Sequence, residues 1–209
     1  STAVVTSEDQ ILSDFDIPPN SWQQGALVSC SLYGALVASV LLFAFGEVLG
    51  RRQEILFANV LYCLGSVGSV LPPAHTSRGI GIIIAARFFY GAGIGLAMHS
   101  APAYIAEIAP SHLRGLLIAL KETLIVLGIL LGYLVGYLCN FASGWRIIWG
   151  SASLLACVSF VGMLFQPESP RFLASRSLGK AEEALRYFRA CENVAEEFEG
   201  IEEAVEEDS

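Results

Sequence analysis

The sequence predicts an all-α membrane protein with five transmembrane helices, followed by short cytoplasmic helices. Of its 209 residues, 54% are apolar and only 15% are charged, whereas about 25% of the residues of a typical soluble domain are charged. Gly25 to Gly46 runs for 22 residues without a charged side chain. As a helix, such a stretch is long enough to cross about 30 Å of hydrocarbon. Further apolar stretches follow it along the chain.

The expected domain organisation follows these apolar stretches. Residues 1–24 contain acidic side chains and a Pro-Pro pair without a sustained period, which is typical of an exposed loop, here an extracytoplasmic one. Residues 166–209 are expected to form a cytoplasmic linker with two acidic helices, an amphipathic one at 181–188 and a glutamate-rich one at 194–205. Because the connections between spans are short, consecutive helices are expected to be antiparallel neighbours. The five expected spans are residues 25–46, 55–71, 80–106, 116–138 and 147–165.

The positions of lysine and arginine predict the orientation in the bilayer, since cytoplasmic loops are enriched in both. One side of the predicted bundle carries only Arg78 and Arg146. The other side is therefore predicted to be cytoplasmic, and its basic residues are Arg51, Arg52, Arg114, Arg171, Arg176 and Lys180. Five spans then place the N-terminus outside, as expected of a chain that lacks a first helix.

The third span combines features that indicate a site rather than a simple apolar core. Arg87 lies about seven residues inside it, roughly 10 Å along a helix, and a charge at that depth in lipid is costly and usually functional. Gly91, Gly93 and Gly95 follow and predict close helix packing. Pro102 removes a backbone donor and predicts a bend.

Small residues also recur in the fourth span. Gly128, Gly132 and Gly136 repeat every four residues on one face, which predicts that another helix approaches that face closely. The same span carries Lys121 and Glu122 near its start. Adjacent residues on a helix do not face each other, so Lys121 is expected to be a poor partner for Glu122.

Three segments resemble the sugar porters of the major facilitator superfamily. Their order and spacing agree with that family, and they are most similar to plant xylose-proton-symporter-like members. The similarity covers about residues 24–176, while the first helix and the second half of the family are absent from this chain. The three segments are Glu47 to Arg52, which resembles the acidic-x-x-Gly-Arg-Arg loop; Arg87 to Gly115, which resembles the fourth helix and the loop after it; and Pro167 to Arg171, which resembles the Pro-Glu-Ser-Pro-Arg segment.

The resemblance implies a partial N-terminal six-helix bundle of a major facilitator fold. It also implies transport of a monosaccharide, a hexose or a pentose, by alternating access and in symport with protons. The substrate would pass near the membrane midplane, between this bundle and the missing second bundle. The implied partners are thus the sugar, protons, the lipid bilayer and the second bundle, and no cofactor is implied.

The resemblance further implies where the substrate and protons bind. The substrate-binding positions are Glu122 and Ile129, and the family usually carries a glutamine where Glu122 stands. A carboxylate accepts hydroxyl donors as an amide does, and it can also titrate, so Glu122 is expected in proton coupling together with Arg87. In proton-coupled members the matching arginine pairs with an aspartate on the first helix. The alternatives are a structural ion pair for Glu122 and a structural buried cation for Arg87.

The motif charges are expected to form a gate at the cytoplasmic helix ends. Opposite charges there can meet as ion pairs in a partly desolvated ring, and by resemblance this ring latches the outward-open state. Ordinary surface charges that end helices are the alternative. The expected gate residues are Glu47, Arg51, Arg52, Glu107, Arg114, Glu168 and Arg171.

Composition and spacing argue against other classes of protein. The net charge is −8, and residues 180–209 carry three basic and eleven acidic side chains, so no basic patch is available for nucleic acid. The five cysteines are scattered singly, without histidines at ligand spacing, which argues against a disulfide framework or a metal site. No nucleophile lies beside a base and its orienting acid, so we expect no enzyme.

Two other functions stay open at this point. The chain could be a truncated, non-transporting membrane protein that acts as a sensor or interaction partner through its acidic tail. It could also belong to a major facilitator carrier of a non-sugar solute. The sequence leaves the membrane open too, between plasma membrane, vacuolar membrane and plastid envelope.

Overall fold

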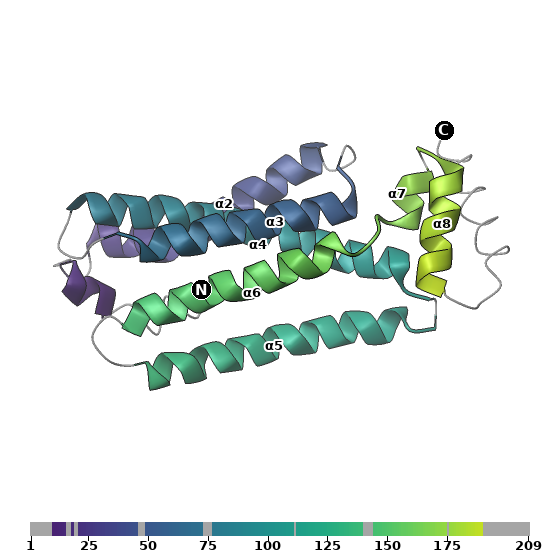
Figure 1. Ribbon diagram of the computed structural model, residues 1–209. Helices are drawn as coiled ribbons and strands as arrows, with labels where there is room; N and C mark the ends of the chain where they lie inside the picture. Colours follow the sequence, from purple (N-terminus) through teal and green to yellow (C-terminus); the bar gives the residue numbers. More distant parts are fainter. Residues whose placement is uncertain are drawn as a thin grey trace.

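The computed structural model describes a bundle of long helices that lie side by side (Figure 1). The described residues are 10–15, 18, 21–45, 49–72, 77–110, 112–139, 144–174 and 176–189, and they contain no strand. The long helices are α2 (Trp22–Phe45), α3 (Arg51–Val70), α4 (Ser77–Ile108), α5 (Arg114–Leu138) and α6 (Gly144–Leu164), followed by the short α7 (Pro170–Ala174) and α8 (Leu178–Arg189).

Helix α4 is the centre of the bundle. It packs along both α2 and α3, and α3 packs in turn along α6. The expectation that consecutive helices are neighbours is therefore wrong for α2, whose main partner is α4 rather than α3. A short connection brings the end of one helix near the start of the next, but it does not decide which helix faces pack.

Glycines let the neighbours of α4 approach its backbone. A Cβ atom added at Gly91 would collide with the Ser31 carbonyl of α2, and one at Gly95 would lie 2.6 Å from the Ala35 carbonyl. On the side of α3, a Cβ atom at Gly93 would lie 2.9 Å from the Ala58 carbonyl. The alternating glycines thus serve the close packing predicted from their spacing.

Polar side chains join α3 to α6. Ser66 Oγ donates to the Trp149 carbonyl, and Cys63 Sγ lies 3.8 Å from the Ser153 carbonyl. Near the other end of the pair, Arg52 donates from Nε to the Met163 carbonyl at 3.2 Å. Positions early in α3 thus meet positions late in α6, so the two helices run antiparallel.

Four of the long helices are apolar and long enough to cross a membrane. They comprise residues 22–44, 79–108, 114–138 and 144–164. Helix α3 is not among them, because polar side chains interrupt its apolar sequence. Several of these, such as Asn59, Ser66 and Ser69, are buried against neighbouring helices.

Helix α5 stands apart from the rest of the bundle (Figure 1), and its apolar side chains are largely exposed. A Cβ atom added at Gly128 would meet no atom within 4 Å. The predicted close approach of another helix is thus wrong at Gly128 within the described part of the chain.

The end of the bundle at residues 10–15 has its own apolar core. Trp145 is fully buried there and packs against Ile11 and Phe15, and its indole nitrogen donates to Asp14 at 2.8 Å. The side chain of Gln10 accepts a hydrogen bond from the Trp145 backbone N–H. Residues 10–15 are therefore partly buried rather than an exposed loop.

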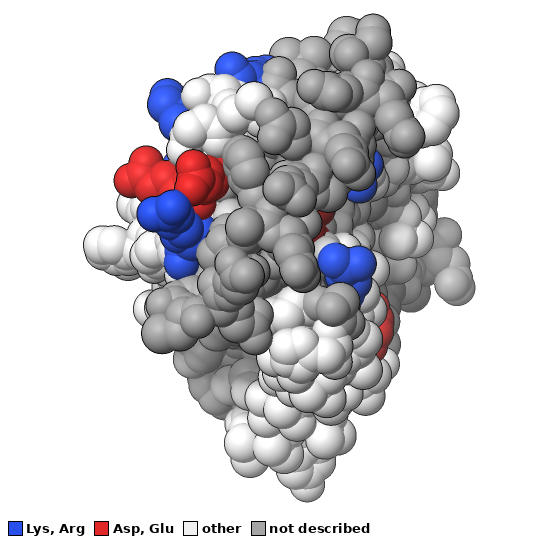
Figure 2. Space-filling model, turned by 90° about the vertical axis from the view of Figure 1, so that its right-hand side faces the viewer, with Lys and Arg blue, Asp and Glu red and all other residues white. Residues whose placement is uncertain are grey.

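The opposite end of the molecule carries α7 and α8. Helix α8 covers the predicted amphipathic stretch, and Ala181, Ala184 and Leu185 form its buried face. Figure 2 looks onto this end: acidic and basic side chains lie in its upper and middle parts, and its lowest part shows none. The second helix expected at 194–205, and Glu47 of the expected gate, lie outside the described residues.

Candidate functional site

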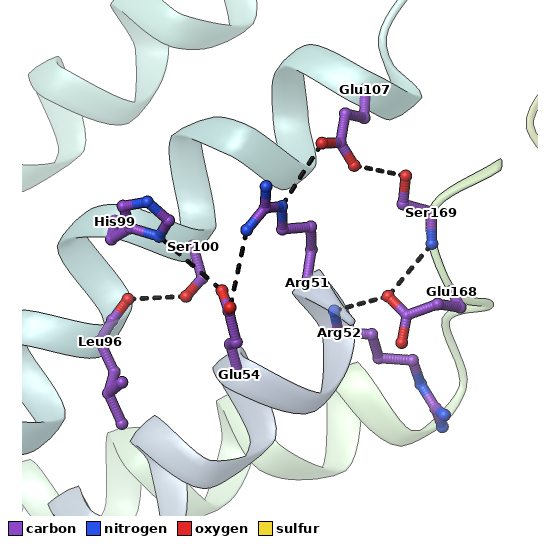
Figure 3. Close-up of polar contacts among 9 residues, drawn as sticks. All are labelled: Arg51, Arg52, Glu54, Leu96, His99, Ser100, Glu107, Glu168 and Ser169. Carbon is purple, nitrogen blue, oxygen red and sulfur yellow. Dashed lines mark hydrogen bonds and ion pairs between the residues drawn. The ribbon is translucent and has the colours of Figure 1, made fainter. Parts of the chain in front are cut away.

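A cluster of charged side chains joins the ends of α3 and α4 to the segment between α6 and α7 (Figure 3). The first turn of α3 supplies two arginines, because the Gly-Arg-Arg motif starts that helix. The last turns of α4 supply a glutamate, and the Pro-Glu-Ser-Pro segment supplies another. We call the following residues the charged cluster: Arg51, Arg52, Glu54, Glu107 and Glu168.

Arg51 is the centre of the charged cluster. Its Nε donates to Glu107 Oε1 at 3.4 Å, and its Nη1 lies 3.6 Å from Glu54 Oε1. The other oxygen of Glu107 accepts a hydrogen bond from Ser169 Oγ. Arg51 and Glu107 are both largely buried, so this contact ties α3, α4 and the α6–α7 connection together in a partly desolvated place.

Arg52 and Glu168 bind backbone groups rather than each other's side chains. Glu168 Oε1 accepts the backbone N–H of Arg52 at 2.8 Å and that of Ser169 at 3.2 Å, so it caps the first turn of α3. The Arg52 guanidinium donates to the carbonyls of Met163 and Leu164. A cation there offsets the negative end of the α6 dipole.

Two further features allow the Pro-Glu-Ser-Pro segment to lie close to α3 and α4. A Cβ atom at Gly50 would lie 2.5 Å from Glu168 Oε2, which explains the glycine before the two arginines. The hydroxyl of Tyr104 donates to the Pro167 carbonyl at 2.8 Å. Both contacts hold the Pro-Glu-Ser-Pro segment against the ends of α3 and α4.

Sequence reasoning missed Glu54 and His99, which belong to the same region. Glu54 is 0% exposed, and its Oε2 lies 3.8 Å from His99 Nδ1. A single glutamate in the first turn of a helix is usually a solvated residue near the dipole, so nothing in its sequence position signalled burial. Its spacing of three from Arg51 was the available clue.

Two predicted gate residues lie apart from the charged cluster. Arg114 and Arg171 are exposed, and neither makes an ion pair within the described part of the chain. Of the seven expected gate residues, the structure thus brings together Arg51, Arg52, Glu107 and Glu168.

Arg87 is buried in the middle of the bundle, where α4 meets α3 and α6. It is 4% exposed, and its guanidinium lies 5.0 Å from the ring centroids of both Tyr90 and Trp149. Its Nε and Nη2 have no hydrogen-bond partner among the described residues. A small cavity beside it, lined also by Ser66 and Ser69, holds about 20 Å³. The aromatic rings stabilise the cation through their π-systems.

Glu122 and Ile129 lie on the exposed surface of α5. The side chain of Glu122 is 60% exposed, and its Oε1 lies 2.7 Å from Lys121 Nζ. The expectation that Lys121 is a poor partner is therefore wrong. Adjacent Cβ atoms on a helix point about 100° apart, but both side chains are long, and the exposed Glu122 can turn toward Lys121, which is 17% exposed. Ile129 is 46% exposed.

Among the described residues, no group of three or more histidine, cysteine, aspartate or glutamate side chains could hold a metal ion.

Comparison with known proteins agrees with this arrangement. The family described as "Sugar (and other) transporter" matches residues 2–209. "D-xylose-proton symporter-like 2" of Arabidopsis thaliana is 44% identical over 153 residues, which are 73% of this chain and 29% of that protein. The human "Proton myo-inositol cotransporter" is 35% identical over 90% of this chain and 28% of its own length. The chain thus spans about a third or less of these relatives.

A solved structure of the proton:xylose symporter XylE, of the major facilitator superfamily, superposes with a TM-score of 0.88. That structure was determined with bound 6-bromo-6-deoxy-D-glucose, and it is 27% identical to this chain. The match covers 99% of this chain and 49% of the solved one. An inward-open structure of XylE from E. coli superposes with a TM-score of 0.85.

The motif segments thus fold together at one end of a helical bundle, and both the family match and the structural match extend over nearly the whole chain. This chain belongs to the sugar (and other) transporter family, and its helices form the N-terminal half of a major facilitator fold in a multi-pass membrane protein.

Proposed function

We propose that this chain forms one half of a transporter that moves a monosaccharide across a membrane together with protons. Family membership supports the transport role. The substrate and the coupling ion are inferred from relatives whose names include D-xylose and proton symport. The second helical bundle, which would form the opposite wall of the substrate path, would come from the rest of the protein.

The observation that carries this proposal is the contact of Arg51 with Glu107 and of Glu107 with Ser169. These side chains belong to three segments that meet at one end of the bundle (Figure 3). When the contacts form, that end of the bundle is held closed. When they break, the segments are free to separate, as alternating access requires. The charged cluster is therefore proposed as the cytoplasmic latch.

The proposal includes a topology. All five helices α2 to α6 would cross the membrane, α3 among them because it packs between α4 and α6 and directs its polar groups to these neighbours. The end with α7 and α8 would face the cytoplasm, and residues 1–24 would lie on the opposite side. Glu122 and Ile129 would contact the sugar, and Arg87 and Glu122 would take part in proton coupling.

Transport can be tested with the full-length protein in proteoliposomes. We would measure uptake of labelled xylose, glucose and myo-inositol, the last because of the human relative's name. We expect accumulation of a monosaccharide when the outer solution is more acidic, and its loss when a proton ionophore is added. Accumulation of myo-inositol alone would favour the non-sugar alternative, and no uptake of any of the three would contradict the proposal.

The latch can be tested with a Glu107→Gln variant. We would follow the reaction of a membrane-impermeant thiol reagent with an Ala109→Cys reporter, in a background without native cysteines. Ala109 directly follows α4 and is 2% exposed while the contacts are formed. Loss of the carboxylate is expected to raise reagent access from the cytoplasmic side, because Arg51 loses its link to α4. Glu182→Gln is the matched control, since Glu182 pairs with Arg186 on the exposed surface of α8. Equal access in both variants would contradict the latch.

A further inference from the structure

Glu54 is the buried carboxylate of the charged cluster, and it makes none of the hydrogen bonds that link the three segments of the latch. It is 0% exposed, and neither of its oxygens has a hydrogen-bond partner among the described residues. The nearest groups that can carry a positive charge, Arg51 Nη1 at 3.6 Å and His99 Nδ1 at 3.8 Å, are both beyond good hydrogen-bond distance. A buried carboxylate in such a place is stabilised either by a closer cation or by a proton.

The charges around Glu54 do not balance. Arg51 contributes one positive charge and faces two carboxylates, Glu54 and Glu107, so these three groups sum to −1. Arg52 and Glu168 cancel each other and are bound to backbone groups. Helix α2, which also packs on α4, carries no Asp, Glu, His, Lys or Arg, and Arg114 at the start of α5 is exposed. One added proton would make the group neutral.

His99 supplies the route for that proton. Its side chain is 51% exposed, while its Nδ1 faces the buried Glu54 (Figure 3). An imidazole can gain or lose a proton near neutral pH. A proton can therefore reach this site from the open side of His99, although Glu54 itself is closed to solvent.

We propose that Glu54 and His99 form a proton-binding site, and that its occupancy decides how Arg51 is shared between Glu54 and Glu107. With the proton bound, on His99 or on Glu54, Glu54 no longer needs Arg51, and Arg51 is held by Glu107. Without the proton, Glu54 draws Arg51 away and weakens the contact between α3 and α4. This inference rests on the proposed latch and gives it a proton dependence.

The test compares the full-length protein with its Glu54→Gln, His99→Gln and His112→Gln variants, each carrying the Ala109→Cys reporter. Reagent access to the reporter, taken relative to the reaction of a free thiol at the same pH because only the thiolate reacts, should fall in the parent as the pH is lowered from 8 to 5. Glu54→Gln should keep access low at every pH, because the carboxylate that competes for Arg51 is gone. His99→Gln should weaken the pH dependence, and the exposed His112→Gln should keep it. A Glu54→Gln variant with the pH dependence of the parent would overturn the proposal.

A second readout separates this proposal from the latch. Infrared difference spectra between pH 8 and pH 5 should contain a carboxylic-acid or imidazolium band that His112→Gln retains and Glu54→Gln and His99→Gln lose. If the band behaves so but Glu107→Gln leaves reporter access unchanged, the proton site stands and the latch fails. If Glu107→Gln raises access but all variants give the same spectrum, the latch stands and the proton site fails.

Discussion

At the scale of single residues, the surroundings of Arg87 fit the flat shape of its guanidinium as well as its charge. Its planar guanidinium lies near the rings of Tyr90 and Trp149, and a lysine ammonium in the same place cannot stack on both. We expect Arg87→Lys to destabilise the folded protein by about 0.5 to 2 kcal/mol. The measurement is the thermal unfolding midpoint in detergent.

The control for this variant is Arg186→Lys, because Arg186 is exposed on α8. If Arg87→Lys and Arg186→Lys have the same unfolding midpoint, a positive charge at position 87 is sufficient for the stability of the protein. Stacking on the aromatic rings would then have no measurable role.

Glu122 allows a second prediction, on the mechanism. It is paired with Lys121 on an open helix face, and an amide still accepts hydrogen bonds from sugar hydroxyls. If Glu122 binds sugar and also carries a proton, Glu122→Gln should retain sugar exchange between equal pools but weaken accumulation against a gradient. Uptake and exchange that both match the parent at every external pH would remove Glu122 from the mechanism.

At the scale of helices, the packing around α4 depends on its glycines. A leucine at Gly91 would collide with the Ser31 backbone, and forcing such a contact typically costs 1 to 3 kcal/mol or more. We expect Gly91→Leu to lower the yield of monodisperse protein and its unfolding midpoint. Gly128→Leu is the matched control, since a Cβ atom there meets nothing within 4 Å. Equal loss in both variants would contradict the role assigned to Gly91.

The pairing of α3 with α6 predicts a specific cross-link. Cys63 Sγ and Cys157 Sγ are 3.4 Å apart, and a disulfide requires them to approach to about 2.05 Å. Mild oxidation with copper phenanthroline should therefore join these two cysteines, as read by mass spectrometry of the digested protein. Cys30 and Cys139 serve as internal controls. A Cys63 that joins Cys139 as readily as Cys157 would show that the two helices are not held in this register.

At the scale of the whole molecule, the orientation in the membrane can be tested directly. Cysteines can be introduced at position 76, which directly precedes α4 in the sequence, and at position 112, which lies between α4 and α5, so that the two positions flank opposite ends of α4. In intact cells, an impermeant thiol reagent should label position 76 and spare position 112, because basic residues favour the cytoplasmic side. The reverse pattern would invert the whole proposed topology.

The long helices could be predicted because their apolar runs are long and carry few charged residues. Arg51, Arg52, Glu107 and Glu168 could be predicted as a group because they stand in motifs. Glu54 could not, since its burial depends on how α3 packs against α4 and not on its own position. The same holds for Lys121 and Glu122, whose contact depends on the open surroundings of α5.

The sequence predicts that consecutive helices are neighbours, which is true of α3 and α4. The pairing of α3 with α6 could not be predicted, because it depends on individual contacts from side chains to carbonyl groups, such as Ser66 with Trp149, which no periodicity encodes. Likewise, the sequence predicts close packing at both Gly91 and Gly128, whereas of these two only Gly91 has a neighbouring backbone beside it.

The polar contacts between α3 and α6 have a consequence for the time course of synthesis. Ser66 and its partner Trp149 are 83 residues apart in the sequence. At a translation rate of about 5 to 20 residues per second, α3 is complete roughly 4 to 17 s before the matching part of α6 exists. During that interval the hydroxyl and thiol groups of α3 need temporary partners, such as water or the insertion machinery. The least apolar helix of the bundle thus depends on a neighbour that the ribosome has not yet made.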